Sequence, residues 1–164
     1  MSKGLSGLFS GTKGAKNAIP GEAVFKSPKY EFFENVSKRK DIDPGGKFDI
    51  VLHGAPNHVK MEVNGRSFSC SPRNLARIIM HNPEYKKGQP IRLLSCYTGS
   101  MTNGFAQNLA NKLNAVVYAP SDIVWAYPDG RIIVASALKG SPVLLPDLTR
   151  IGKFIPFYPG GNRE

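Results

Sequence analysis

The sequence contains one histidine and one cysteine whose settings suit nucleophilic catalysis. His53 follows the largely apolar residues 48–52 and precedes Gly54, and Cys96 follows the largely apolar residues 91–95. A cysteine thiol attacks a carbonyl carbon when a nearby imidazole takes up its proton and later returns it. We therefore treat His53 and Cys96 as a candidate catalytic dyad.

The neighbours of this pair suggest how a reacting group would be held. The backbone N–H groups of Gly54 and Cys96 are candidates to donate hydrogen bonds to a developing oxyanion. A helix that starts close behind the cysteine would favour the ionised thiolate. Four further residues flank the thiol and are expected to line the site: Ser95, Tyr97, Thr98 and Gly99.

Alternating strands and helices would place the two residues on one edge of a sheet. The pattern predicts strands over 47–53, 91–95 and 115–119, with helices over 72–82 and 105–113 between them. This order is typical of a parallel sheet with helices on its faces. Because such sheets carry functional groups at the carboxyl ends of their strands, His53 and Cys96 are expected on the same rim.

The rest of the chain predicts two β-hairpins within a single α/β domain. One hairpin surrounds Asn64-Gly65, and the other surrounds Pro128-Asp129-Gly130. We expect residues 1–21 to form a flexible basic linker or tail and residues 22–164 to form the catalytic domain. Within that domain, residues 47–135 are the expected core. Residues 136–164, which are rich in Pro and Gly, are expected to wrap it as coil.

Composition limits the classes of partner. The chain has 22 Lys and Arg against 12 Asp and Glu, a net charge of +10, which attracts polyanions such as nucleic acid or phosphorylated ligands. Its apolar runs are too short to cross a bilayer, and no secretory signal peptide is evident. Cys70 and Cys96 are too few for a disulfide scaffold and are expected as free thiols.

Other candidate groups are weaker. His58 and His81 have no partners at metal-ligand spacing, so no metal site is expected. An imidazole could be oriented by any of three carboxylates, which the sequence does not separate: Asp122, Asp129 and Asp147. An aromatic and basic surface for single-stranded RNA could be formed by Trp125, Tyr127 and Arg131, although such residues are more often packing pairs of a hairpin.

Two segments carry a resemblance to a known family. Residues 49–54 (DIVLHG) and 91–96 (IRLLSC) resemble the strand-His-Gly and strand-Cys motifs of caspase-like (clan CD) cysteine peptidases. The order of the two motifs is similar to that in self-processing domains of large bacterial toxins. A wider run of segments, residues 53–57, 94–99, 105–110, 117–120 and 124–125, is similar to C-terminal domains of bacterial polymorphic toxins.

The resemblance implies a small caspase-like domain with a mostly parallel central sheet, flanking helices and the dyad His53 and Cys96, with Gly54 in the oxyanion hole. It implies no dependable third catalytic residue. The expected activity is that of a cysteine endopeptidase, in a toxin or effector that cleaves its own precursor or a target protein. Such a domain would be secreted or translocated and would act in a target-cell cytoplasm.

The resemblance also bears on partners. No cofactor is expected to be required, although a polyanion such as an inositol phosphate could order the site, and a cognate immunity protein is an expected partner. Two alternatives stay open: a basic toxin domain acting on nucleic acid, as a ribonuclease or deoxyribonuclease, and an inactive caspase-like binding module.

Overall fold

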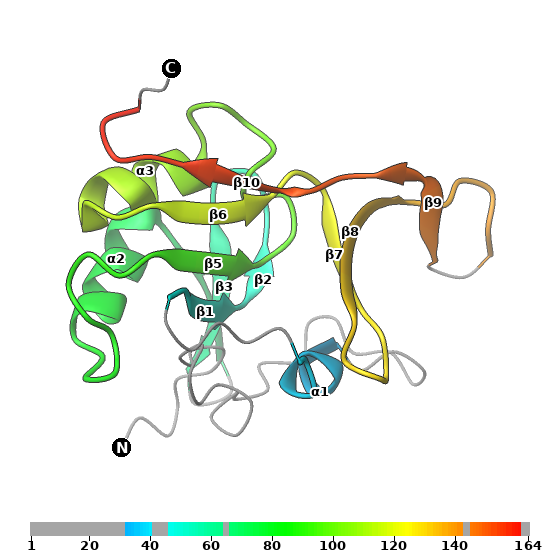
Figure 1. Cartoon of the computed structure of the whole chain (residues 1–164), viewed down its shortest axis with the longest axis horizontal. Helices are drawn as coiled ribbons and strands as arrows, with labels where there is room; N and C mark the ends of the chain where they lie inside the picture. The colour runs from blue at the N-terminus through cyan, green and yellow to red at the C-terminus, as the bar shows by residue number, and fades with distance from the viewer. Residues whose placement is uncertain (1–31, 41–45, 64–65, 143–144, 162–164) are drawn as a thin grey trace.

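The structure is a computed structural model that describes residues 32–40, 46–63, 66–142 and 145–161. A four-stranded sheet forms its centre, with two helices on one side and two smaller antiparallel sheets packed around it (Figure 1). The predicted tail, residues 1–21, lies outside the described residues, as does the tip of the first predicted hairpin at Asn64-Gly65.

The central sheet follows the predicted parallel order. Its strands, in order across the sheet, are β1 (Phe48–Val51), β5 (Ile91–Leu94), β6 (Val117–Pro120) and β10 (Phe154–Phe157). The first three run parallel, and β10 pairs antiparallel with β6. Every residue of β1 and β5 is buried, which explains why both read as nearly continuous apolar runs.

Two helices cover one face of this sheet. Helix α2 (Pro72–Met80) starts where the Ser71 hydroxyl accepts a hydrogen bond from the Asn74 N–H at 3.1 Å, with Pro72 in the first turn. Helix α3 (Phe105–Leu113) follows the loop after Cys96. The apolar sides of both helices pack with β1, β5 and β6 in the larger hydrophobic core.

A second hydrophobic cluster lies on the other face. Helix α1 (Phe32–Ser37) contributes Phe32 and Val36, and strand β7 (Ile123–Ala126) contributes Val124 and Ala126. They pack on Val51 and Leu94 from the ends of β1 and β5, and Cys96 is partly buried against the same cluster. The rim that carries the thiol is therefore covered by α1 and β7.

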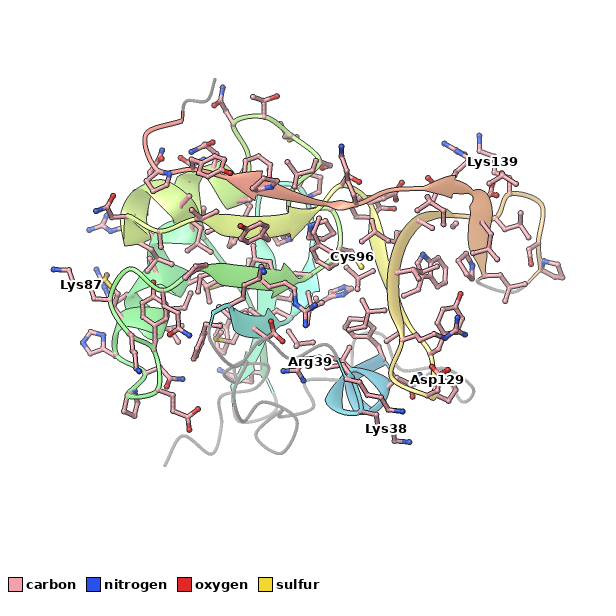
Figure 2. All side chains as sticks on the ribbon, in the orientation of Figure 1. Lys38, Arg39, Lys87, Cys96, Asp129 and Lys139 are labelled. Atoms are coloured by element: carbon pink, nitrogen blue, oxygen red, sulfur yellow. The ribbon has the colours of Figure 1, made fainter. Side chains whose placement is uncertain are left out.

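Two three-stranded antiparallel sheets complete the fold, and both predicted hairpins are confirmed. Strand β2 (His53–Gly54) pairs with β3 (Val59–Val63), which pairs with β4 (Arg66–Cys70). Strand β7 pairs with β8 (Ile132–Ala137), which pairs with β9 (Pro146–Ile151). At the β7–β8 turn Gly130 has a φ of +94°, which favours glycine. A Cβ there would collide with the carbonyl oxygen of Lys38, the residue that follows α1. Figure 2 labels Asp129 and Lys38 close to this contact.

A buried ionic cluster joins the segment after α1 to the central sheet. The Asp49 carboxylate accepts a hydrogen bond from Arg39 Nε at 2.7 Å. It also accepts two from Arg92, from Nε at 2.9 Å and from Nη2 at 2.8 Å. The Asp49 and Arg39 side chains are almost fully buried. The stability of such a cluster depends strongly on its geometry, because each buried charge is destabilising unless its partners stay in place.

Two predictions need correction. Residues 136–164 were expected to be coil, but they contain β9 and β10, and β10 extends the central sheet. Pro146 and Pro156 disguise these strands in the sequence; β10 lies at the edge of its sheet, where a proline is tolerated. The strand predicted over 47–53 also divides: β1 ends at Val51, and His53 belongs to β2, which turns toward β3.

Candidate active site

The backbone brings the two predicted motifs together. Val51 of β1 pairs in register with Leu94 of β5, and the next residue along each strand is linked by a hydrogen bond from the Leu52 N–H to the Ser95 hydroxyl at 3.2 Å. His53 is the residue after Leu52, and Cys96 is the residue after Ser95. The parallel order therefore places both at the carboxyl end of the same pair of strands, as predicted.

Gly54 lies directly on the backbone of the cysteine. A Cβ at Gly54 would lie 2.6 Å from the Cys96 carbonyl oxygen and 2.9 Å from the Cys96 nitrogen. Carbon atoms do not approach backbone atoms that closely, so only glycine allows this contact. The small residue after His53 thus lets the two segments touch.

This contact gives a direct test of the site's construction. We expect Gly54→Ala to lower the free energy of unfolding by about 3 kcal/mol, because the added methyl meets backbone atoms that cannot rotate away. Urea denaturation measures the change. Gly140→Ala is the control: nothing lies within 4 Å of its Cβ position, and its φ of +79° leaves only backbone strain of about 1 kcal/mol. Equal losses for the two variants would contradict the close approach.

A tight turn follows the cysteine. Tyr97 has a φ of +64°, a left-handed conformation that is uncommon for a residue with a large side chain. Its N–H donates to the Asp122 carbonyl at 2.9 Å, and the Gly99 N–H donates to the Pro120 carbonyl at 2.9 Å. Strained residues held by their surroundings concentrate at functional sites. The turn that carries Cys96 is thus fixed by the chain leaving β6.

The residues predicted to line the site divide into two groups. Tyr97 is 37% exposed and lies at the surface. Ser95 and Thr98 are fully buried, and the Thr98 hydroxyl donates to the Ser95 carbonyl at 2.8 Å. Gly99 is also buried, and a Cβ there would lie 2.6 Å from the Ala119 carbonyl oxygen. Ser95, Thr98 and Gly99 therefore support the turn from below, while Tyr97 and Gly54 border its surface.

The Cys96 thiol is protonated at neutral pH. Cys96, labelled in Figure 2, is a free, partly exposed cysteine, and its sulfur accepts a hydrogen bond from the Val124 N–H at 3.4 Å. Burial raises the pKa of the thiol, the Val124 N–H opposes this, and the negative charge of Asp122 adds to the rise. The helix start that was expected close behind the cysteine lies at Phe105, nine residues further on, while burial beside β7 raises the pKa of the thiol.

The His53 imidazole is neutral at pH 7. Its pKa is lowered to about 4, first by burial and then by the positive charges of Lys60, its partner across β2 and β3, and of His58. A neutral ring can accept a proton, whereas an imidazolium cannot. The candidate pair therefore consists of a thiol and a neutral imidazole rather than an ion pair.

The structure separates the three carboxylates that the sequence left open. Asp122 lies near Cys96 and accepts hydrogen bonds from the Ser136 hydroxyl at 2.5 Å and the Ile123 N–H at 2.8 Å. Asp129 pairs with Arg131 on the exposed β7–β8 turn, and Asp147 bonds to Thr149 in β9. Of the three carboxylates, Asp122 is thus the one that lies near the Cys96 thiol. Its position just after the end of β6 is a signal in the sequence that could have singled it out.

The aromatic and basic surface considered for single-stranded RNA does not form, because its central residue, Trp125, is buried. Trp125 is 4% exposed, and its indole N–H donates to the Ala135 carbonyl at 2.9 Å across the hairpin. Arg131 stacks on the Tyr127 ring, with its guanidinium carbon 4.5 Å from the ring centroid. These are the packing pairs of a hairpin, and Trp125 cannot stack on a base without unfolding it.

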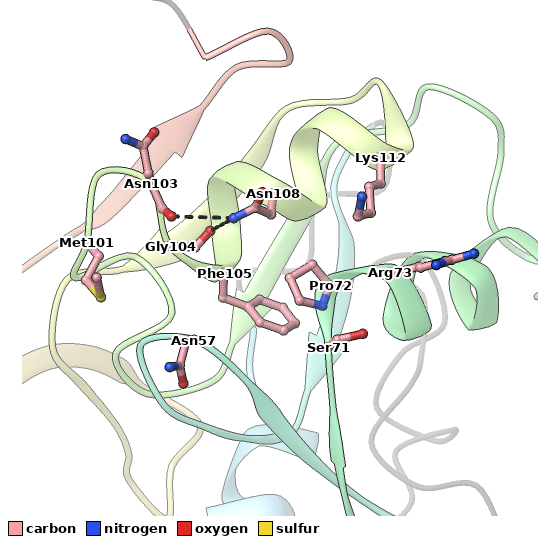
Figure 3. A pocket seen from close by; sticks show the side chains of 10 residues that line it. All are labelled: Asn57, Ser71, Pro72, Arg73, Met101, Asn103, Gly104, Phe105, Asn108 and Lys112. Atoms are coloured by element: carbon pink, nitrogen blue, oxygen red, sulfur yellow. Dashed lines mark hydrogen bonds between the residues drawn. The ribbon is translucent and has the colours of Figure 1, made fainter.

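The structure also has a groove that sequence reasoning missed, and none of the predicted site residues lines it. It has a volume of about 310 Å³ and lies between the loop that follows β2, the loop that follows the Cys96 turn, and helices α2 and α3 (Figure 3). The Phe105 N–H at the start of α3 donates to the Pro56 carbonyl at 3.1 Å, which joins the two loops. The groove could not be predicted from a periodic pattern in the sequence, because its walls come from four separate segments.

Comparisons with known proteins give a family but no function. No curated protein matches the chain, and no solved structure does. Within the part of the chain that the structure describes, no helix has the length and apolar character to span a membrane. Residues 20–134, a span that includes His53 and Cys96 and more than half of the chain, match the family model described as "Domain of unknown function (DUF8616)". The chain belongs to this family of domains of unknown function.

Proposed function

We propose that this protein is a caspase-like cysteine peptidase in which Cys96 is the nucleophile and His53 the general base. The observation that carries the proposal is the seating of His53-Gly54 on the Ser95-Cys96 backbone at the shared end of two parallel strands. The left-handed Tyr97 adds support, because it fixes the turn on which the thiol is presented.

The chemistry follows from a neutral pair. As the Cys96 sulfur attacks the peptide carbonyl carbon, its proton passes to the His53 ring and the carbonyl oxygen becomes an oxyanion. The N–H groups of Gly54 and Cys96 are the proposed oxyanion donors. The imidazolium then protonates the leaving amine as the C–N bond breaks. Water, deprotonated by His53, hydrolyses the thioester and restores the thiol.

The biological setting is part of the same proposal. The domain acts as a bacterial toxin or effector that is secreted or translocated, and it cleaves its own precursor or a protein in the target-cell cytoplasm. A cognate immunity protein protects the producing cell. The proposed chemistry needs no cofactor, while the net charge of +10 supports association with a polyanion such as an inositol phosphate.

Peptide cleavage can be tested without knowing the substrate. We expect purified protein to generate new N-termini in a proteome-derived peptide library, detected by mass spectrometry, and His53→Ala to slow this about 100-fold through loss of the general base. Because the pKa of His53 is about 4, the wild-type rate should stay level from pH 6 to 7 and fall as pH drops through about 4, when the ring becomes protonated.

The matched control is His81→Ala. His81 is an exposed histidine at the end of α2, where its Nδ1 lies 2.8 Å from the Arg77 carbonyl oxygen. This variant should keep the wild-type rate. A wild-type protein that cleaves no peptide, or a His53→Ala variant as fast as wild type, would refute the proposal.

The strong positive charge favours a second candidate, a toxin acting on nucleic acid. Expression would then degrade cellular RNA or DNA, and Cys96→Ser would not diminish the effect. If instead wild type and His53→Ala had the same effect on cells while neither cut peptide or nucleic acid, the domain would be an inactive binding module.

A further inference from the structure

Exposed aliphatic side chains concentrate on one part of the molecule, the β8–β9 arm, which we define as residues 132–142 and 145–153. Nine large apolar side chains are exposed among the described residues, and five of them are scattered over other elements. The remaining four all lie on the arm: Leu138, Leu145, Leu148 and Ile151. Single exposed apolar residues are normal on a protein surface, whereas such a concentration marks a contact surface.

The backbone of the arm holds these residues at one end of the molecule. The Leu138 N–H donates to the Leu145 carbonyl at 2.8 Å, and Ile151 pairs in register with Ala135. Leu148 and Ile151 of β9 are 64% and 58% exposed. In Figure 1 the arm lies at the end opposite helices α2 and α3. An extended surface can therefore approach it without meeting the helices.

The arm is also cationic. It carries three exposed cations, Lys139, Arg150 and Lys153, and none of them has an ion-pair partner in the described part of the chain. Figure 2 labels Lys139 beside β9. The single carboxylate of the arm, that of Asp147, is occupied locally, because it accepts hydrogen bonds from the Thr149 hydroxyl at 2.6 Å and N–H at 2.9 Å. The arm thus presents aliphatic groups within a positive field.

This chemistry favours a lipid surface over a protein as the occupant. Protein interfaces gain most of their binding energy from Trp, Tyr and Arg, and Leu is under-represented among such residues. The arm contains no aromatic residue. A second copy of the chain would bring two proteins of net charge +10 together, which repel each other. Aliphatic side chains flanked by cations instead match the boundary between acyl chains and anionic headgroups.

We infer that the β8–β9 arm docks this protein on the surface of an anionic lipid bilayer. Leu148 and Ile151 enter the boundary of the acyl chains, and Lys139 and Arg150 contact lipid phosphates. Thr149 and Arg150 lie between the two aliphatic residues along β9, so the contact is shallow. It is also reversible, because stable anchoring takes far more apolar area than two side chains supply. This docking does not depend on the proposed peptidase.

Co-sedimentation with vesicles tests the inference. We expect wild-type protein to pellet with vesicles of phosphatidylcholine and phosphatidylglycerol, and to stay in solution with vesicles of phosphatidylcholine alone. Leu148→Ser combined with Ile151→Ser should weaken binding to the anionic vesicles about 10-fold through loss of buried apolar area. Lys139→Gln combined with Arg150→Gln should weaken it about 10-fold through loss of attraction to the headgroups. Circular dichroism verifies that each variant is folded.

The controls make the same changes elsewhere on the surface. Met80→Ser combined with Met101→Ser removes two exposed apolar side chains outside the arm. Arg77→Gln combined with Lys87→Gln removes two exposed cations, and Figure 2 labels Lys87 at the end of the molecule opposite Lys139. Both control variants should bind as the wild type does. Equal losses in the arm variants and the controls would mean general attraction of a basic protein and would overturn the inference.

Other occupants of the arm would give different results. If the wild type ignores anionic vesicles and instead forms dimers in sedimentation velocity that Leu148→Ser with Ile151→Ser abolishes, the arm is an interface between copies of this chain. If it ignores the vesicles but binds a fluorescent peptide of alternating Leu and Glu, and the same variant loses that binding, the occupant is an acidic protein. Either result would overturn the docking to lipid.

Discussion

The substitution Cys96→Ala is expected to abolish covalent labelling by a peptidyl acyloxymethyl ketone, a reagent whose methylene carbon is attacked by a nucleophilic thiol to form a thioether with release of the carboxylate. The loss should be complete, because no other group at this rim can form the thioether. Labelling of the wild type should stay level from pH 6 to 7, where neutral His53 takes up the thiol proton, and accelerate at higher pH as the Cys96 thiol, whose pKa is raised by burial, begins to ionise. Intact-mass spectrometry follows the reaction.

The chain supplies its own control in Cys70. This second free thiol is 5% exposed, and burial raises its pKa to about 11. Cys70→Ala should therefore label as fast as the wild type. Labelling that survives in Cys96→Ala and disappears in Cys70→Ala would place the reactive thiol in the wrong strand and remove the basis of the proposed dyad.

The largest expected loss of stability comes from Asp49→Asn. The neutral amide would leave two buried guanidinium groups, Arg39 and Arg92, without the carboxylate they share. Removing one partner of a buried ionic cluster costs about 3–5 kcal/mol, a large part of the stability of a domain this size. Urea denaturation followed by circular dichroism should show a much lower midpoint, and the variant could fail to accumulate as folded protein.

Asp129→Asn is the matched control, with the same chemical change in an exposed pair. Asp129 and Arg131 lie 3.0 Å apart on the β7–β8 turn, and both side chains are more than half exposed. Because water screens such a pair, this variant should denature at nearly the wild-type midpoint. Similar midpoints for Asp49→Asn and Asp129→Asn would show that the buried cluster does not hold α1 to the sheet.

Much of the fold could be predicted from local signals. Apolar runs marked β1, β5 and β6, Ser71-Pro72 marked the start of α2, and turn residues marked both hairpins. Strands β9 and β10 escaped because their residues are stabilised by pairing with β8 and β6 rather than by periodicity, and because proline lies in both. Helix α1 has only six residues, too few for a periodic pattern to emerge.

The sequence predicted how the backbone brings the two motifs of the candidate site together. It did not predict which other residues surround the Cys96 thiol. Parallel strand order was enough to bring His53-Gly54 to Cys96. The thiol's protonation state depends on Val124 and Asp122, whose approach is set by how the chain leaves β6 and re-enters as β7. The burial that raises the pKa of the thiol comes from these distant segments and cannot be inferred from the residues around Cys96.

The antiparallel strand β10 has a consequence for synthesis on the ribosome. It covers the free edge of β6, and the Lys153 carbonyl just before it accepts a hydrogen bond from the Ser121 N–H at 2.9 Å, beside the loop that holds the Tyr97 turn. Until residue 157 has left the exit tunnel, β6 stays an open edge and this loop lacks its last support. A nascent chain therefore completes its central sheet only after residue 157 has emerged, and in the proposed peptidase any self-cleavage would wait until then.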